Sequence, residues 1–188
     1  LQVSRNVGRL GLARVASAPL SELDGANLKQ WLSAQRLTPR EAAQLCIKVA
    51  EALHAGSIVT LERDPERIAL ARDYLDRAGV GDRVEIVEGD ARQTIPTLEG
   101  PFDFLFLDAT KGEYRDYLEL AAPLLAPRAV LAVDNVLMSG KVADPGAEGH
   151  WSEEQLDAQR AFNAALVGGG DWRASVLPVG DGVLVGSR

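Results

Sequence analysis

From residue 57 onward, short apolar runs alternate with segments of helical periodicity, and this alternation constrains the fold more than any other feature of the sequence. Strands that are separated by helices usually assemble into mostly parallel α/β sheets. The run at 102–108 does not alternate in polarity, so we expect that strand to be buried on both faces. The predicted strands are SIVTLE (57–62), RVEIVEGD (83–90), FDFLFLD (102–108) and AVLAVD (129–134).

Helix signals fill the segments between these strands. Asp64 is suited to be an N-cap ahead of Pro65 at the first helical position, and Gly79 is suited to end that helix. Other predicted helices cover 91–98, with an interruption near Pro96, 113–125, and a segment that opens with an S-x-x-Q capping box at 152–155 and runs to about residue 166.

The end of the chain has a different pattern. The runs RASVLPV and GVLVGS flank Gly180-Asp181-Gly182, which is typical of an antiparallel hairpin. Parallel strands followed by such a hairpin predict a Rossmann-like sheet with one reversed strand. Residues 1–45 predict a helical segment, with a cap at Ser21 and a helix start at Thr38-Pro39, while Arg5, Arg9 and Arg14 fit a solvated face.

Composition limits the classes of function. A chain of 188 residues has the length of one domain, and its net charge of −7 weakens a nucleic-acid interpretation. The only cysteine is Cys46, so no disulfide can form within the chain and a cytoplasmic setting is the default expectation. One cysteine and two histidines are also too few for a zinc site of the usual His/Cys kind. No apolar run approaches the roughly 20 residues that span a bilayer, and we expect neither a signal peptide nor a membrane partner.

Four predicted strands end in, or lead directly to, an acid: Glu62, Asp90, Asp108 and Asp134, the last followed by Asn135. Ligands of open parallel sheets lie beyond the carboxyl ends of the strands. Any one of these acids could equally well be a helix cap or an ion-pair partner. Four at one edge favour a binding site.

The types of residue suggest separate roles. An acid at the end of the second strand can bind ribose hydroxyls, which indicates Glu62, and Asp90 with its neighbour Ala91 lies one strand over, where an adenine could be reached. Asp108, Asp134 and Asn135 form an all-oxygen set suited to Mg²⁺ or another divalent cation such as Ca²⁺ or Mn²⁺.

Lys111 follows Asp108 by three residues. A lysine whose pKa is lowered by burial and a nearby ion can act as a general base. A solvated lysine after a strand is the alternative. Because the strand-end acids are expected nearby, we favour a catalytic role for Lys111 together with Asp108.

The segments FLFLDATKGEYRDYL and AVDNVLMSGKVADP resemble the metal-dependent class I O-methyltransferases of the caffeoyl-CoA and catechol type, over about residues 57 to 188. The resemblance implies a seven-stranded, mostly parallel Rossmann-like sheet with helices on both faces and a C-terminal antiparallel hairpin. It also implies S-adenosylmethionine as the cofactor. With it we expect one methyltransferase domain over 1–188, with its Rossmann-like core at 46–188, and a homodimer.

The resemblance also implies residue roles. It assigns Asp108, Asp134 and Asn135 to the metal and Lys111 to the base. Glu62 is assigned to the ribose and Asp90, with Ala91, to the adenine. Asp108 borders the cofactor as well.

One departure from the family concerns the glycine-rich loop that should follow the first strand. No E-x-G-x-x-x-G pattern occurs, and the segment from Pro39 to about His54 reads as one continuous helix. We therefore expect that residues are missing between Leu45 and Cys46, with an empty position in the sheet. A true deletion is the alternative, and it would leave a protein that does not methylate.

Methyl transfer to a hydroxyl of a catechol-like or other small molecule is thus the leading hypothesis. A tRNA hydroxyuridine O-methyltransferase is an alternative that the acidic net charge disfavours. A non-catalytic nucleotide-binding protein is the other, if the loop is absent.

Overall fold

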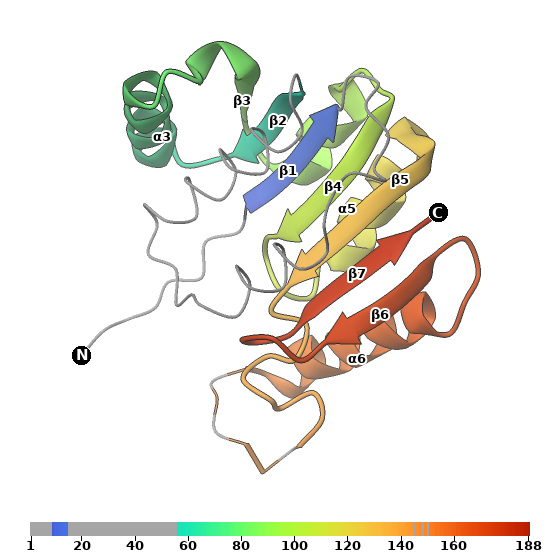
Figure 1. Cartoon of the computed structure of the whole chain (residues 1–188). Coiled ribbons are helices and arrows are strands. Elements are labelled where there is room, and N and C mark those ends of the chain that lie inside the picture. The colour runs from blue at the N-terminus through green and yellow to red at the C-terminus, as the bar shows by residue number, and fades with distance from the viewer. Residues whose placement is uncertain (1–8, 15–55, 145, 148, 150) are drawn as a thin grey trace.

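The computed structural model describes residues 9–14, 56–144, 146–147, 149 and 151–188. Their strands form one sheet in the order β3-β2-β1-β4-β5-β7-β6 (Figure 1). The strands are β1 (Arg9–Arg14), β2 (Ser57–Glu62), β3 (Val84–Glu88), β4 (Phe102–Asp108), β5 (Leu125–Asp134), β6 (Arg173–Leu177) and β7 (Val183–Ser187). The α-helices in these ranges are α3 (Pro65–Arg77), α4 (Ala91–Thr94), α5 (Tyr114–Ala121) and α6 (Glu153–Val167).

The sheet is mixed, so the prediction of mostly parallel pairing is wrong. Among the described strands, only β2–β3 and β4–β5 pair in parallel, whereas β1 runs antiparallel to both β2 and β4, and β7 runs antiparallel to both β5 and β6. The difference arises at the centre, where Arg9–Arg14 forms a strand in a segment that we predicted to be helical.

This central strand fills the position that we expected to be empty. Leu10 pairs with Leu61 of β2 on one side and with Leu107 of β4 on the other. Backbone groups in a sheet interior need partners, and β1 supplies them to both neighbours. The predicted helices between residues 15 and 55 and the join of Leu45 to Cys46 lie outside the described residues.

Two predicted helix starts and the C-terminal hairpin are confirmed, whereas the helices predicted over 91–98 and 113–125 are shorter, at Ala91–Thr94 and Tyr114–Ala121. The Asp64 side chain caps α3 by accepting from the backbone N–H groups of Glu66 and Arg67. Ser152 and Gln155 form the predicted capping box at the start of α6. The C-terminal hairpin of β6 and β7 is antiparallel, as predicted. Within the described ranges, no helix is long and apolar enough to cross a membrane.

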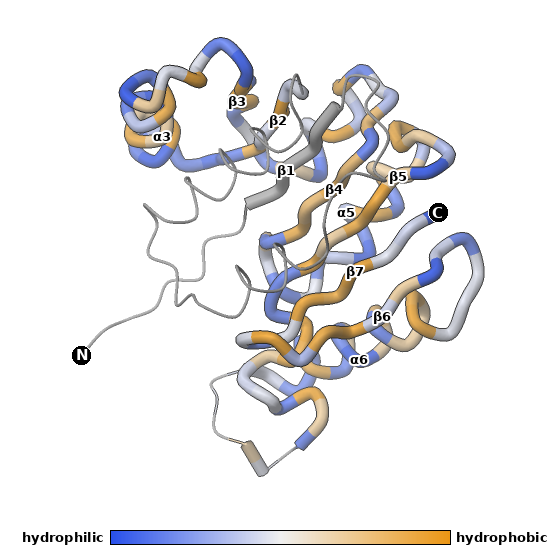
Figure 2. Tube along the Cα trace, in the orientation of Figure 1, coloured by the Kyte–Doolittle hydropathy of each residue, from blue (hydrophilic) through white to orange (hydrophobic). Residues whose placement is uncertain are grey.

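Helices α5 and α6 lie side by side on one face of the sheet (Figure 1). Apolar side chains of β4 and β5 form the centre of the core, and Figure 2 shows both strands as largely apolar. On β4, Leu105 and Leu107 are fully buried, but Phe104 and Phe106 on the other face are only half-buried. The prediction that β4 is buried on both faces is therefore too strong. Helices on both faces of the sheet stay a prediction.

Candidate active site

The four strand-end acids lie at one edge of the sheet. Glu62 is the last residue of β2, Asp108 of β4 and Asp134 of β5, and Asp90 follows the end of β3 by two residues. Strands β2 and β4 run in the same direction because both are antiparallel to β1. Since β3 pairs in parallel with β2 and β5 with β4, all four carboxyl ends reach the same edge.

Lys111 connects two of these strand ends. Its side chain is buried, and the ammonium nitrogen Nζ lies 3.4 Å from Asp108 Oδ1 and 3.4 Å from the backbone oxygen of Asp134. Nζ also donates a hydrogen bond to the Tyr114 hydroxyl, which in turn donates to the Asp134 carbonyl at 3.1 Å. The adjacent parallel strands β4 and β5 and the start of α5 thus place these groups in one polar cluster.

Burial opposes charge within this cluster. Burial lowers the pKa of the Lys111 ammonium, against the opposing attraction of Asp108 and Asp134. Burial is also the main cause that raises the pKa of Asp134, and the nearby Asp108 adds to it. The pKa of the Tyr114 hydroxyl is raised well above its ordinary value, again mainly by burial. Lys111 is therefore shifted towards its neutral form, which is the form a general base requires.

Asn135 directly follows β5 and has a left-handed backbone with φ of 58°. Its backbone N–H donates to Asp134 Oδ1 at 2.7 Å. This bond fixes the Asp134 carboxylate against the start of the following loop. Because φ determines the direction of the Cα–Cβ bond, this left-handed backbone also determines the direction in which the Asn135 side chain leaves the loop.

The oxygen set of Asp108, Asp134 and Asn135 fits a hard divalent cation in its chemistry, with two carboxylates and one amide. Lys111 reaches the Asp108 carboxylate and the Asp134 backbone oxygen through Nζ, and both carboxylates oppose the loss of its proton. In the part of the chain that the structure describes, no three His, Cys, Asp or Glu side chains converge in a way that could hold a metal ion. The case for a metal at this site therefore rests on the donor chemistry of two carboxylates and one amide.

Glu62 lies apart from this cluster. It is buried, and its Oε1 accepts from the backbone N–H groups of Arg63 at 2.8 Å and Asp64 at 3.0 Å. These bonds orient the carboxylate at the turn into α3. They also give Glu62 a structural task, in addition to any role in binding a ribose.

Asp90 is the N-cap of α4 and accepts from the backbone N–H of Arg92 at 2.9 Å. Its side chain also pairs with the Arg92 guanidinium, and hydrogen bonding from Arg92 is the main cause that lowers the pKa of Asp90. The helix-cap alternative considered for a strand-end acid thus holds for Asp90. Ala91 is the first residue of α4 and is half-buried.

Glu62 and Asp90 are separated from the Lys111 cluster by the width of the sheet. Strand β1 lies between β2 and β4, so at about 4.8 Å per strand the ends of β2 and β4 are roughly 10 Å apart, with β3 about 5 Å further. The structure thus brings Asp108, Lys111, Asp134 and Asn135 together and places Glu62 and Asp90 along the same edge. That spread suits an extended ligand with one end at each group.

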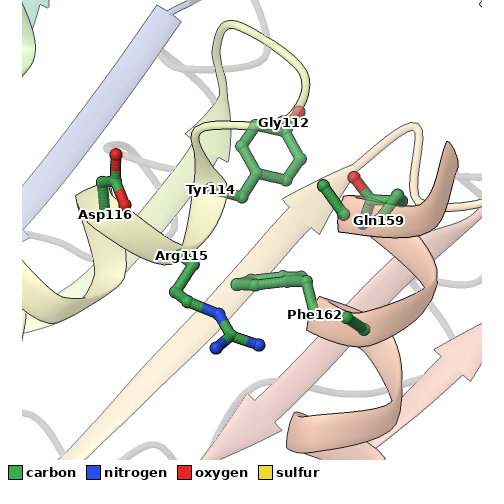
Figure 3. Close-up of a pocket in the computed structure, with 8 residues that line it drawn as sticks. Gly112, Tyr114, Arg115, Asp116, Gln159 and Phe162 are labelled. Carbon is green, nitrogen blue, oxygen red and sulfur yellow. The ribbon is translucent and has the colours of Figure 1, made fainter. Parts of the chain in front are cut away.

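A pocket of ≈ 330 Å³ lies between α5 and α6 (Figure 3). Its wall includes Tyr114, Arg115 and Asp116 from α5 and Gln159 and Phe162 from α6. The Tyr114 ring packs edge-on against Phe162, with centroids 5.8 Å apart. Tyr114 is therefore shared, because its ring faces this pocket while its hydroxyl reaches Lys111. The strand-end acids are not part of the pocket wall.

Two residues of the site were not predicted. Tyr114 is almost fully buried at the start of α5. A buried tyrosine hydroxyl needs a polar partner, so the position of Tyr114 three residues after Lys111 is the sequence feature that could have indicated it. Asp181 was identified only as part of a turn. It lies within electrostatic reach of Lys111 and Asp134, and burial raises its pKa. No local pattern connects the hairpin turn to the end of β5.

A family model described as O-methyltransferase matches residues 44–188. The chain belongs to the O-methyltransferase family. Among its relatives, a catechol O-methyltransferase of Niastella koreensis is 38% identical over 115 residues, which cover 59% of this chain and 50% of the relative. A catechol O-methyltransferase of Mycobacterium tuberculosis is 48% identical over 88 residues, which cover 46% of this chain and 40% of the relative. This family member thus spans half or less of the length of these two relatives.

The fold of this O-methyltransferase family member is also similar to solved structures. The O-methyltransferase from Bacillus cereus, solved in complex with SAH, matches with a TM-score of 0.66 at 26% identity, over 86% of each chain. The Podospora anserina methyltransferase PaMTH1, also bound to SAH, matches with a TM-score of 0.60 at 34% identity, over 68% of this chain and 58% of that one. The Rossmann-like α/β class predicted from the sequence is therefore confirmed, with the mixed pairing described above.

Proposed function

We propose that this chain transfers a methyl group from S-adenosylmethionine to a hydroxyl of a catechol-like or other small molecule, assisted by a divalent metal. The observation that carries the proposal is the cluster in which Lys111 lies 3.4 Å from Asp108 and contacts the end of β5, in a member of the O-methyltransferase family. Relatives named catechol O-methyltransferase and neighbours solved with SAH support the substrate class and the cofactor.

The residues divide into two groups along the sheet edge. Glu62 would bind the ribose hydroxyls of the cofactor, and Asp90 with Ala91 would border the adenine. Asp108, Asp134 and Asn135 would hold Mg²⁺, Mn²⁺ or Ca²⁺. When bound, such an ion would orient two substrate oxygens and lower the pKa of the reacting hydroxyl.

Lys111 would accept the proton of that hydroxyl. Its burial favours the neutral amine, while Asp108 and the Tyr114 hydroxyl hold Nζ in place. Asp108 would thus serve both the metal and the base, and it would border the cofactor. Once the substrate oxygen is deprotonated, most of the remaining acceleration would come from holding it in line with the methyl group.

A methyl-transfer assay tests the proposal. The chain is incubated with S-adenosylmethionine and a panel of catechols, phenylpropanoid thioesters, and unmodified or hydroxylated tRNA, with and without Mg²⁺. We expect methylated small molecules, with activity abolished by a chelator and in Asp134→Ala. Asp171→Ala, an exposed acid before β6, serves as the control that should keep full activity.

Two other outcomes would select the alternatives. Methylation of hydroxylated tRNA alone would favour the tRNA enzyme, against which the net charge of −7 argues. Cofactor binding without turnover would favour a non-catalytic nucleotide-binding protein.

We also propose a homodimer and a cytoplasmic location for this protein. The single cysteine is compatible with a reducing compartment. Sedimentation at two concentrations, tenfold apart, would distinguish a dimer from a monomer, and fractionation of the source cells would test the location.

A further inference from the structure

The turn between β6 and β7 is bonded to the loop that follows β5. The backbone N–H of Val136 donates to the Gly182 oxygen at 3.0 Å, and that of Leu137 donates to the Asp181 oxygen at 3.0 Å. These bonds continue the pairing of β5 with β7 beyond its last register pair, Asp134 with Val183. The loop that begins at Asn135 is therefore shaped against the hairpin turn.

The Asp181 side chain extends this contact further along the loop. Its Oδ1 accepts a hydrogen bond from the backbone N–H of Ser139. Ser139 has φ of 59°, Met138 has φ of 50° and Asn135 has φ of 58°. Residues with side chains rarely adopt this left-handed conformation, and they keep it only where the surroundings hold them in place. The Asp181 carboxylate is one such restraint.

Helix α6 holds the same loop from the other side. Asn163 Nδ2 donates to the Val136 oxygen at 2.8 Å, and the Asn163 Oδ1 accepts from Gln159 Nε2 at 2.9 Å. Val136 is therefore bonded through both of its backbone polar groups. Asp181 differs from these anchors, because its side chain accepts from Ser139, an exposed residue further along the loop.

We propose that Asp181 is a positioning residue for the oxygen set of Asp108, Asp134 and Asn135. Its carboxylate fixes the loop from Asn135 to Ser139, which contains three left-handed residues, and so places the Asn135 and Asp134 side chains. This inference rests on the proposed function, because it assigns a task to Asp181 in a site that would hold a divalent ion. Asp181 itself would not touch the ion. A competing interpretation is that Asp181 only stabilises its own turn.

Three variants test the proposal: Asp181→Ala removes the acceptor, Asp181→Asn keeps an oxygen at the same place, and Asp171→Ala removes an exposed acid at the opposite end of β6. Mn²⁺ binding to each variant of the 188-residue chain is measured by the electron paramagnetic resonance signal of free Mn²⁺. We expect about tenfold or greater weakening in Asp181→Ala, less than about threefold in Asp181→Asn, and no change in Asp171→Ala. Equal Mn²⁺ affinity in Asp181→Ala and the parent chain would overturn the positioning role.

Amide hydrogen exchange provides a readout that needs no metal. The Ser139 amide should exchange at least tenfold faster in Asp181→Ala than in Asp181→Asn, while the Val136 amide stays protected in both. If the parent chain binds no Mn²⁺ but this exchange pattern holds, the metal part of the proposed function fails and the restraint by Asp181 stands. If the Ser139 amide exchanges equally in all variants, the restraint itself is wrong. Asp181→Ser, whose side chain is too short to reach Ser139, replaces the alanine variant should that one not fold.

Discussion

Lys111 contacts Asp134 through the backbone, because its ammonium nitrogen lies 3.4 Å from the Asp134 carbonyl oxygen. The Asp134 carboxylate instead accepts from the Asn135 N–H at 2.7 Å through Oδ1. The candidate base and the candidate metal ligand therefore share one cluster without competing for the same bond. Each can be altered separately by mutation.

Replacement of Lys111 tests its role as the base. Lys111→Met should lower the single-turnover rate of methyl transfer by roughly 10²- to 10⁴-fold, the usual contribution of a general base. Lys111→Arg keeps a positive charge but stays protonated at any ordinary pH, so it should be as slow as the methionine variant. Rapid-quench measurements at saturating cofactor give the rate. Appreciable activity in Lys111→Arg would show that the residue supplies charge rather than taking a proton.

Tyr114→Phe tests the support of the base. The variant keeps the ring that packs on Phe162 but removes the hydroxyl that joins Lys111 to the Asp134 carbonyl. Loss of one partner of a buried hydrogen bond should lower the free energy of unfolding by about 1–3 kcal/mol. We expect a lower kcat with little change in KM for the substrate, because Lys111 loses its orientation. Urea denaturation and steady-state kinetics measure the two effects. A changed KM at constant kcat would contradict this role.

Glu62→Gln tests the ribose contact without disturbing the turn. The glutamine oxygen can still accept from the backbone N–H groups of Arg63 and Asp64, as Oε1 of Glu62 does now. Loss of the charged acceptor should weaken SAH binding by about 1.5–3 kcal/mol, measured by calorimetry. The melting temperature should stay close to that of the parent chain. Unchanged SAH affinity would assign Glu62 to the turn alone.

Asp90→Ala tests the helix cap and has a defined pH dependence. Loss of the cap should lower the free energy of unfolding by about 0.5–2 kcal/mol near neutral pH, whereas Asp90→Asn should keep most of it. Folding lowers the pKa of Asp90 below its ordinary value of 3.8, so the charged carboxylate stabilises the fold above pH 3.8. This charge-dependent stabilisation is lost as the pH falls through the pKa of the folded state. The difference between the parent and Asp90→Ala should therefore shrink below pH 3.8. Denaturant titrations from pH 7 down to 2.5 measure it, and a difference that grows on acidification would contradict the sign.

The parts of the fold that depend on neighbouring residues could be predicted from the sequence. Strands β2 and β4 have the predicted bounds because each is a continuous apolar run with sharp ends. The caps at Asp64 and Ser152 were predicted because a helix end is satisfied by residues two or three positions away. Strand β5 begins at Leu125, earlier than predicted, because Leu125 pairs with Phe102 of β4 ahead of an irregularity in the register that includes Pro127.

The remaining features depend on residues that are distant in sequence. Strand β1 pairs with residues more than forty positions away on both sides, so local pattern does not show that Arg9–Arg14 is a strand, nor its direction. The bond from the Ser139 N–H to Asp181 spans 42 residues. The strand-end acids could be found because each lies next to an apolar run, whereas Asp181 lies in a turn that would look the same in any hairpin.

The close packing of Gly182 against Leu137 bears on how this protein could be engineered. A Cβ atom at position 182 would lie 2.4 Å from Leu137 Cγ, so only glycine fits beneath the loop that follows β5. A replacement loop with a bulkier side chain at position 137 would therefore lack room above the backbone of residue 182. In a chimaeric protein, the loop that follows β5 and the segment 180–182 are best exchanged as one unit.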